Sequence, residues 1–340
     1  MRVAVDGRAL RPGTARARGV ARYLRSVLRE LKRAFPDDEY ALVDPGRLRL
    51  AGAALAGRPR LDRLAGGCDV AWIPAPAPVA VSRNLPFVLT AHDLSFEHRA
   101  RDYPLYDRAW LELARPRTLA RRAARVVCVS EGTRQAVISD WEVEPTRTRT
   151  VLLGPGRAPG TPEEPRQELP ERFLLAVGAL EPRKRPLLLA EAHRRAAARG
   201  LGAGLVFAGD GPLRARLESI SVTVLGQVPD PVLDALYERA LAVVCPSREE
   251  GFGFTPLEAV TRGTPAIVAD LPVFGETLGD GALRVTPGNP DSLADALLRI
   301  DADPVLRERL AAAGREAAGR LSWETTARET RGILAEAAGR

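Results

Sequence analysis

Two acidic residues frame a glycine-rich stretch whose make-up suits ligand binding better than core packing. In PSREEGFGFTPLEAVTRGTPAIVAD, residues 246–270, Glu250 and Glu258 stand eight positions apart around Gly-Phe-Gly-Phe. Gly251 and Gly253 would let the chain turn tightly before a helix, so that successive N–H groups and the helix dipole form an anion site. Carboxylates touching a phosphate would repel it, but they could accept hydrogen bonds from hydroxyl groups on either side. A nucleotide-sugar, with its diphosphate between a sugar and a ribose, offers this arrangement.

A purely structural interpretation of Glu258 also stays open. Thr255-Pro256-Leu257-Glu258 could begin a helix, with Thr255 as N-cap and the Glu258 carboxylate returning to the Thr255 amide as a capping box. Gly263 would then end the helix. Capping leaves Glu250 and the glycines unexplained.

Strands alternating with helices must position this stretch. Short apolar runs rich in β-branched residues predict twelve strands. In order, the runs are RVAVD, YALVD, DVAWIP, PFVLTAH, RVVCVS, RTVLLG, RFLLAVG, GLVFAGD, VTVLGQV, LAVVCPS, TPAIVAD and ALRVTP. Apolar residues at helical spacing over 20–31 predict a helix after the first strand. The pattern predicts an α/β protein with two doubly wound, Rossmann-like domains of parallel strands that face each other across a cleft.

A stretch rich in Pro, Gly and Glu separates the two series of strands. We predict a first domain over residues 1–155, a linker over 156–170 and a second domain over 171–322. A C-terminal helix over 323–340 could return to the first domain. Because ligands bind beyond the carboxyl ends of parallel strands, the loops after the strands should hold the chemistry.

Composition narrows the class of protein. A chain of 340 residues, 45% hydrophobic and 27% charged, is typical of a globular protein with two domains. The start MRVAVDGRAL lacks a signal-peptide pattern and no apolar run reaches the ~18 residues of a membrane span, so we expect a cytoplasmic protein. Cys68, Cys128 and Cys245 are widely spaced in or beside apolar runs, which favours reduced thiols over a disulfide or zinc framework.

The net charge of +7 is unevenly distributed. Residues 1–160 hold 28 basic and 17 acidic residues, whereas 161–340 hold 22 and 26. The arginine-rich segment 115–126, RPRTLARRAARV, is either a solvated helix face in an arginine-biased chain or a surface attracted to an anionic membrane or a lipid-diphosphate acceptor. Only 5% of residues are aromatic and no stacking platform is visible, so we expect no nucleic acid as a partner.

The motifs, taken in order along nearly the whole chain, resemble those of retaining family 4 glycosyltransferases of the GT-B fold. The resemblance rests on Glu250 and Glu258 around GFGFTPLEA and on GVARYLRSVL, VLTAHDLSFE, VCVSEGTRQ, VGALEPRKRP, FAGDGP and LGQVPDPVLDALYERA. Within that family, TAHDLSF and GALEPRK are most similar to bacterial mannosyltransferase-like members that build polysaccharide or O-antigen chains. The resemblance implies transfer of a sugar, with mannose from GDP-mannose as the best guess, from a GDP- or UDP-sugar to a glycan or polyprenyl-linked acceptor. The enzyme would be cytoplasmic, with peripheral attachment at the inner face of the membrane as an option.

The resemblance also implies site residues. The donor-binding residues would be Gly19, Gly178, Arg183, Lys184, Gln227, Val228, Gly253, Phe254, Thr255 and Glu258, and the catalytic residues would be His92, Lys184 and Glu250. Lys184, supported by Arg183, would neutralise the donor diphosphate together with the backbone amides of Phe254 and Thr255. Glu258 would bind the ribose hydroxyls and Glu250 the donor sugar.

Three further roles follow from the resemblance. The Gln227-Val228 backbone would meet the edge of the base, Gly19 would let its loop approach the phosphates, and His92 would lie by the reacting sugar. His92 ends an apolar strand, and the following Asp93 could orient its ring. Two structural alternatives stay open: local backbone could satisfy His92, and Lys184 could be a solvated charge.

Neither a metal nor a cofactor is expected. A preorganised amide nest and a fixed cation can stabilise a leaving diphosphate without a metal. One candidate histidine and no paired cysteines make a metal site a poor prediction.

Two other classes of function stay open. An enzyme of the same two-domain shape could be a nucleotide-sugar epimerase, or a phosphorylase with a pyridoxal cofactor whose Schiff-base lysine could only be Lys32 or Lys184. A non-catalytic partner subunit that binds nucleotide or polysaccharide is the third class. Donor hydrolysis without acceptor would separate the transferase from the partner subunit.

Overall fold

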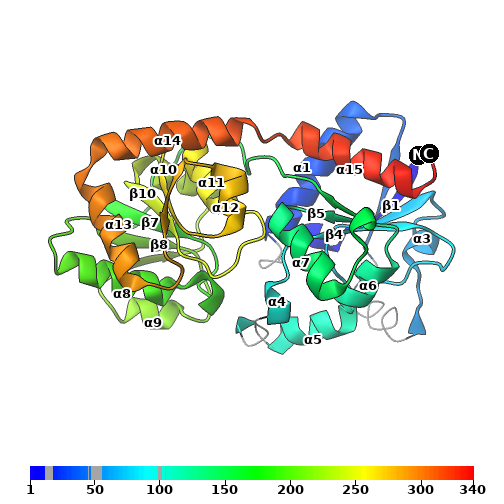
Figure 1. Cartoon of the computed structure of the whole chain (residues 1–340), viewed down its shortest axis with the longest axis horizontal. Helices are drawn as coiled ribbons and strands as arrows, with labels where there is room; N and C mark the ends of the chain where they lie inside the picture. The colour runs from blue at the N-terminus through cyan, green and yellow to red at the C-terminus, as the bar shows by residue number, and fades with distance from the viewer. Residues whose placement is uncertain (12–17, 45, 47–55, 99–101, 104) are drawn as a thin grey trace. The chain divides into compact units, whose positions relative to one another are not determined.

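The chain forms two compact units, each built on one parallel sheet (Figure 1). The computed structural model describes residues 1–11, 18–44, 46, 56–98, 102–103 and 105–340. Unit 1 comprises Met1–Gly154 and Ser322–Arg340, and unit 2 comprises Pro155–Leu321. Each sheet has six strands with helices between them, which confirms the predicted α/β class and the two doubly wound domains.

Unit 1 has the strand order β2-β1-β3-β4-β5-β6. Five of its strands lie on the predicted runs of the first half, whereas β6 overlaps the sixth run, residues 149–154, only at Arg149 and Thr150. The strands are β1 (Arg2–Asp6), β2 (Glu39–Val43), β3 (Val70–Ile73), β4 (Phe87–Ala91), β5 (Arg125–Cys128) and β6 (Thr148–Thr150). The helices among the described residues are α1 (Arg18–Ala34), α3 (Leu61–Leu64), α4 (Ser95–His98), α5 (Leu105–Ala114), α6 (Pro116–Arg122), α7 (Glu131–Trp141) and α15 (Trp323–Ala337), with 3₁₀ turns η1 (Arg8–Leu10) and η4 (Pro145–Arg147).

The helix predicted after the first strand is confirmed as α1. Of its side chains at helical spacing, Tyr23, Leu24, Val27 and Leu31 are fully buried. The last helix, α15, lies against α1, so the C-terminal end of the chain belongs to unit 1 and both chain ends are close together (Figure 1).

Unit 2 has the order β12-β11-β10-β7-β8-β9, again on the predicted runs. The strands are β7 (Phe173–Val177), β8 (Gly204–Ala208), β9 (Thr223–Gly226), β10 (Ala242–Cys245), β11 (Ala266–Ala269) and β12 (Ala282–Val285). The helices are α8 (Pro186–Ala197), α9 (Arg214–Glu218), α10 (Asp230–Arg239), α11 (Phe254–Thr261), α12 (Pro272–Leu278), α13 (Pro290–Ala302) and α14 (Pro304–Gly319), with the 3₁₀ turn η5 (Pro182–Lys184).

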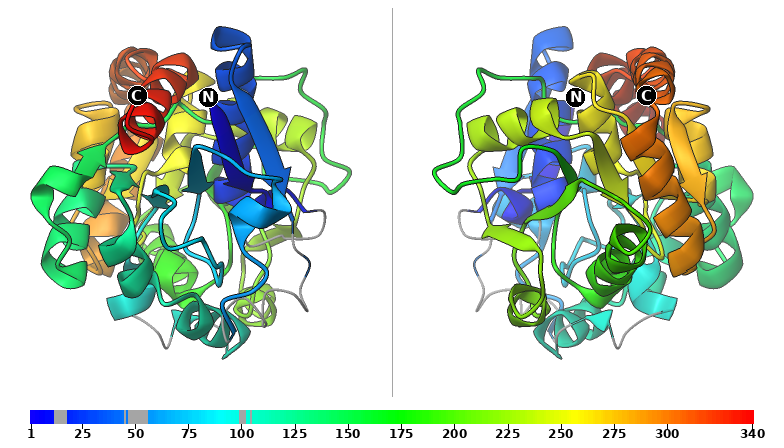
Figure 2. Two further views of the ribbon diagram at one scale, coloured as in Figure 1. Left: turned by 90° about the vertical axis from the view of Figure 1, so that its right-hand side faces the viewer. Right: turned by 90° about the vertical axis from the view of Figure 1, so that its left-hand side faces the viewer.

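Helices cover both faces of the unit 2 sheet. On one face α8 and α13 lie side by side and pack on Leu174 and Leu205 (Figures 1 and 2). On the other face α10 and part of α11 pack on Phe173, Leu175 and Val206. Because neighbouring residues of a strand point to opposite faces, strands covered on both sides are apolar at every position, which is why continuous apolar runs predicted them.

The segment predicted as a linker, residues 156–170, lies within unit 2 and contains no helix or strand. Side-chain hydrogen bonds from α10 and from the end of α11 fix its first residues, as described below. The arginine-rich segment 115–126 is helical only over Pro116–Arg122, because the chain enters β5 at Arg125.

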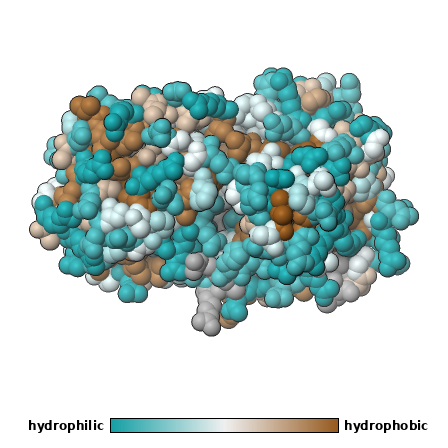
Figure 3. All heavy atoms as spheres, in the orientation of Figure 1, coloured by the Kyte–Doolittle hydropathy of each residue, from teal (hydrophilic) through white to brown (hydrophobic). Residues whose placement is uncertain are grey.

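The face of the molecule seen in Figure 3 is largely hydrophilic, with hydrophobic side chains scattered over it. No helix among the described residues combines the length and the apolar character needed to cross a bilayer.

Candidate active site

The strand order of unit 2 reverses between β7 and β10, and a small pocket lies at the carboxyl ends of these two strands. Gly178 and Lys184, from the loop after β7, and Cys245 and Ser247, from the end of β10, are among its lining residues. Ligands of open α/β sheets bind at such a switch point. The two motifs that the sequence singled out therefore meet where the fold favours a ligand.

Lys184 and Glu250 form an ion pair beside this pocket. The Lys184 Nζ atom lies 2.5 Å from Glu250 Oε1, and the side chains are 22% and 10% exposed. Ser247 Oγ donates a second hydrogen bond to the same oxygen at 2.8 Å. Burial alone would raise the pKa of Glu250, but the charges of Lys184 and Arg183 and the hydrogen bonds hold that pKa below its ordinary value. Glu250 is therefore an ionised acceptor at neutral pH.

A backbone hydrogen bond joins the two loops that carry this pair. The Arg248 N–H donates to the Arg183 carbonyl at 2.9 Å, while the Arg183 side chain bonds Glu181 at 3.0 Å. Gly178 directly follows β7, and its N–H donates to the Ala208 carbonyl at 3.0 Å. The loop between β7 and α8 is thus fixed on both sides, by β8 and by the loop after β10.

Helix α11 begins at Phe254, so the capping box that stayed open as an alternative for Thr255 and Glu258 does not form. Gly253 is the N-cap, with φ of 84°, and a Cβ there would lie 2.6 Å from the Phe274 ring. Only glycine suits both this backbone conformation and this space. Phe254 and Thr255 are consequently the first two residues of the helix, the end at which the helix dipole and the direction of the backbone N–H groups suit an anion.

Glu258 lies inside α11 and is only 2% exposed. Its Oε1 accepts the Arg157 backbone N–H at 3.1 Å, and its Oε2 accepts the Tyr237 hydroxyl at 3.3 Å. Gln227 and Val228 follow β9, which β8 separates from β7. Gln227 is exposed and Val228 is half-buried.

His92 follows β4 in unit 1. Its Nε2 lies 2.8 Å from the Pro74 carbonyl, and its ring meets the Tyr23 ring edge-to-face at 5.0 Å. A carbonyl only accepts hydrogen bonds, so Nε2 carries the proton and Nδ1 is left as the acceptor of the neutral ring. Burial lowers the pKa of His92, although the Pro74 carbonyl and Asp93 oppose this, and the ring is neutral at pH 7.

Asp93 does not take the orienting role expected for it. Its Oδ1 accepts the Ser95 N–H at 3.0 Å and the Ser95 hydroxyl at 2.5 Å, whereas the Pro74 carbonyl holds the His92 ring. Gly19 lies in the first turn of α1, and a Cβ added there would meet no described atom within 4 Å.

Sequence reasoning missed Ser247 and the cluster around Glu258. Ser247 follows a strand end, a position that could have singled it out. The cluster of Arg157, Asp234, Tyr237 and Arg262 had no such signal, because two of its members are arginines in an arginine-rich chain and the first lies in the predicted linker. Across the described parts of the chain, no three His, Cys, Asp or Glu side chains gather as a metal ion would need.

The protein has two units, each built on a parallel sheet, and a pocket lies at the switch point of the sheet of unit 2. These features define the class as a two-domain α/β protein with a ligand site of the open-sheet type. The family model described as "Glycosyl transferases group 1" matches residues 161–317, and "Glycosyltransferase Family 4" matches residues 17–154. The chain belongs to the glycosyltransferases of the GT-B fold with these family 4 and group 1 domains.

Similar curated proteins include several bacterial transferases. The chain is 46% identical to the O-antigen chain mannosyltransferase RfbU of Salmonella typhimurium, over only 24% of each chain. It is 31% identical to a D-inositol 3-phosphate glycosyltransferase of Frankia alni, over 76% of this chain and 70% of that protein. It is 28% identical to the alpha-D-kanosaminyltransferase of Streptomyces kanamyceticus, over 76% and 74%.

Solved structures share the fold. Sucrose-phosphate synthase from Thermosynechococcus elongatus has a TM-score of 0.74 at 20% identity, covering 99% of this chain and 98% of that one. HepE of Anabaena in complex with UDP-glucose has a TM-score of 0.71 at 18% identity, covering 98% and 99%. At these identities the likeness concerns the fold alone.

Proposed function

We propose that the protein is a retaining glycosyltransferase that moves a sugar from a nucleotide-sugar to a glycan or lipid-linked acceptor. The observation that carries the proposal is the Lys184–Glu250 pair, because it sets a cation and an ionised acceptor side by side at the switch point of the group 1 domain. The cation suits a diphosphate and the acceptor suits sugar hydroxyls.

Charge development during transfer explains the cation. The leaving diphosphate gains negative charge as the glycosidic bond breaks, and a preorganised cation with backbone amides stabilises that charge. An ammonium has three donors, so Lys184 can bond both Glu250 and a diphosphate oxygen. The amides of Phe254 and Thr255 and the nearby Arg183 complete the proposed site. Because these groups already face the charge, we propose that neither a metal nor another cofactor takes part.

The remaining donor contacts are proposed from the family resemblance. Glu258 would accept hydrogen bonds from the ribose hydroxyls, and the Gln227-Val228 backbone would meet the base. Glu250 would hold the donor sugar. In unit 1, His92 would contact the reacting sugar through Nδ1, since Nε2 is held by the Pro74 carbonyl.

We propose mannose, from GDP-mannose, as the transferred sugar. Support comes from relatives named as mannosyltransferases, among them RfbU, O-antigen chain mannosyltransferase B of Escherichia coli and the phosphatidyl-myo-inositol mannosyltransferase of Mycobacterium leprae. The alpha-D-kanosaminyltransferase and the UDP-glucose complex of HepE show that other sugars, and uridine as the base, occur among similar proteins. UDP-sugars are therefore the first alternatives to test.

We further propose that unit 1 attaches the enzyme to the cytoplasmic face of an anionic membrane, where a polyprenyl-linked acceptor would be anchored. Arg115, Arg117 and Arg122 on and beside α6 are exposed, and the neighbouring α5 exposes Leu105 (77%) and Leu113 (41%). Exposed cations on one helix and exposed apolar side chains on the neighbouring helix suit an anionic lipid surface.

Donor turnover tests the proposed activity. The protein would be incubated with GDP-mannose, UDP-glucose or UDP-N-acetylglucosamine without acceptor, and release of nucleoside diphosphate would be followed. We expect slow hydrolysis of one donor that is lost in Lys184→Ala. Binding without hydrolysis or transfer would favour the partner subunit, and conversion of the donor into its epimer, seen by NMR, would favour the epimerase.

A further inference from the structure

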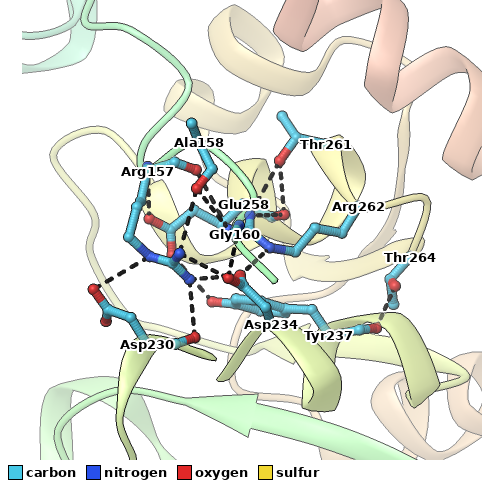
Figure 4. A network of polar contacts seen from close by, with 10 residues as sticks. All are labelled: Arg157, Ala158, Gly160, Asp230, Asp234, Tyr237, Glu258, Thr261, Arg262 and Thr264. Carbon is cyan, nitrogen blue, oxygen red and sulfur yellow. Dashed lines mark hydrogen bonds and ion pairs between the residues drawn. The ribbon is translucent and has the colours of Figure 1, made fainter. Parts of the chain in front are cut away.

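A cluster of buried charged side chains lies next to Glu258, on the adjoining elements α10, the end of α11 and residues 156–160 (Figure 4). Asp234 on α10 is fully buried and bonds two arginines, Arg157 at 2.5 and 2.8 Å and Arg262 at 2.5 Å. The Arg262 side chain is 1% exposed and that of Arg157 is 21% exposed. None of these three side chains has a part in the proposed donor site.

The cluster is ionised. Burial alone would raise the pKa of Asp234, but the Arg157 hydrogen bonds, the Gly160 N–H and Arg262 together hold it below its ordinary value. Taking three charges out of water is costly unless each is paired and hydrogen-bonded. Asp230 also lies 3.4 Å from Arg157, at the exposed edge of the cluster.

The cluster fixes the path of residues 156–160, which have no helix or strand of their own. The Gly160 N–H donates to Asp234 at 3.0 Å. Arg262 donates to the carbonyls of Arg157 at 3.4 Å and Ala158 at 3.5 Å. The segment is thereby tied to α10 and to the end of α11, the helix that carries Glu258.

The fixed segment in turn holds one carboxylate oxygen of Glu258. The Arg157 N–H bonds Oε1 at 3.1 Å, and the preceding Gly156 lies directly against the side chain. A Cβ at Gly156 would be 2.6 Å from Glu258 Cγ, and its φ of 96° also favours glycine. Only glycine at position 156 therefore allows the backbone to lie this close to the Glu258 side chain.

The cluster also holds the second oxygen, through Tyr237. The Tyr237 hydroxyl donates to Glu258 Oε2 at 3.3 Å, while the Arg262 guanidinium lies 5.2 Å from the ring centre. The Tyr237 carbonyl accepts the Thr264 hydroxyl. Both oxygens of Glu258 are therefore oriented by groups that Asp234 and Arg262 fix (Figure 4).

We propose that Asp234, Arg262 and Tyr237 are positioning residues that orient the Glu258 carboxylate for recognition of a ribose diol. The proposal rests on the proposed function, in which Glu258 binds the ribose. The Arg157 N–H and the Tyr237 hydroxyl each bond one oxygen of Glu258, and together they fix the plane and the direction of the carboxylate. An acceptor oriented before binding loses less rotamer freedom when the ligand arrives. The cluster should therefore set selectivity for ribose over 2′-deoxyribose.

The test compares nucleotide pairs that differ by one hydroxyl. Affinities of UDP, 2′-deoxy-UDP, GDP and 2′-deoxy-GDP would be measured by calorimetry for the wild type, Tyr237→Phe and Asp234→Asn. We expect the wild type to prefer the ribonucleotide about tenfold, as one charge-assisted hydrogen bond provides. Tyr237→Phe keeps the ring and removes only the hydroxyl, and should lower this preference about threefold or more with 2′-deoxynucleotide affinity unchanged.

Two further variants make the result decisive. Thr277→Val removes another buried hydroxyl of unit 2, one that bonds the Val273 carbonyl, and should leave the preference intact. Glu258→Gln should abolish it. Should Asp234→Asn fail to fold, Tyr237→Phe still decides the matter. Two outcomes would overturn the inference alone: a preference for the ribonucleotide that persists in Tyr237→Phe, or an equal loss of affinity for the ribonucleotide and the 2′-deoxynucleotide in that variant. If the wild type shows no preference for the ribonucleotide, the proposed role of Glu258 is overturned, and the inference with it.

Discussion

The Lys184 ammonium lies 2.5 Å from Glu250 Oε1, although 66 residues separate the two along the chain. The pair joins the loop after β7 to the loop after β10, and Ser247 shares the same carboxylate oxygen. Removal of Lys184 would therefore have two effects, loss of a cation for the diphosphate and loss of the partner that keeps Glu250 ionised.

Lys184→Ala and Glu258→Ala should each weaken nucleoside-diphosphate binding. Loss of a charge-assisted hydrogen bond corresponds to about 10- to 100-fold in affinity. Calorimetry with GDP and UDP measures the change, and circular dichroism checks that the variants remain folded. Lys32→Ala is the matched control, because Lys32 is the other lysine of the chain and is exposed on α1. Unchanged affinity for GDP and UDP in both variants would contradict the assignment of Lys184 and Glu258 to the donor site.

The contribution of Glu250 to stability should depend on pH. Its pKa lies below the ordinary value in the folded protein, so the stabilisation is complete above the unfolded-state pKa of ~4.3 and is lost as pH falls through the folded-state pKa. Thermal unfolding of wild type and Glu250→Gln, at pH 7 and at pH 3, should show a stability gap that narrows in acid. A gap of the same size at both pH values would contradict an ionised, paired Glu250.

Activity should persist without divalent metal. The proposed cation and amides already face the developing charge, so transfer in excess EDTA should match transfer with added Mg²⁺ or Mn²⁺. The measurement is the rate of nucleoside-diphosphate release. Activity abolished by EDTA and restored by either ion would show that a metal takes part.

His92→Ala should lower turnover ~100-fold, as loss of a positioned catalytic group does, and leave nucleoside-diphosphate affinity unchanged. A contact with the reacting sugar acts on the transition state rather than on nucleotide binding. His193→Ala is the matched control, because its Nε2 also bonds a backbone carbonyl at 2.8 Å, that of Ala203. Near-normal turnover in His92→Ala would give His92 a structural role.

Unit 1 should bind anionic vesicles in a salt-sensitive way. Sedimentation with phosphatidylglycerol vesicles at low salt should pull down the wild type, and 0.5 M salt should release it, because surface charge is screened over a few ångströms there. Arg117→Gln with Arg122→Gln should weaken binding. The paired change Arg216→Gln with Arg309→Gln removes two exposed arginines from unit 2 and should not. Absence of binding at low salt would assign the arginines to compositional bias.

Local pattern was enough to place the secondary structure. Strands buried on both faces are apolar throughout and helices with one buried face are periodic, so twelve strands and α1 could be predicted from short windows of sequence. The start of α11 could not be predicted from such a window. Thr255 is a good N-cap residue, but the left-handed backbone at Gly253 and the Phe274 ring beside it placed the cap two residues earlier.

The cluster behind Glu258 lay beyond any local signal. Arg157 and Asp234 are 77 residues apart, and Arg262 lies a further 28 residues along the chain. Their types are common in this sequence, and only the packing of α10 against α11 and the adjoining segment makes them one buried network.

The sequence by itself determined which loops are candidates for the chemistry, because glycines, a rare lysine and two glutamates follow strand-like runs at recognisable spacing. Tertiary structure decided how those loops meet. Strand pairing is non-local, and the placement of β10 beside β7 rather than beside β9 brings Glu250 to Lys184 at the switch point of the sheet. Tertiary structure likewise decided that Glu258 is a buried carboxylate bonded at both oxygens, since the Arg157 N–H and the Tyr237 hydroxyl come from segments distant in sequence.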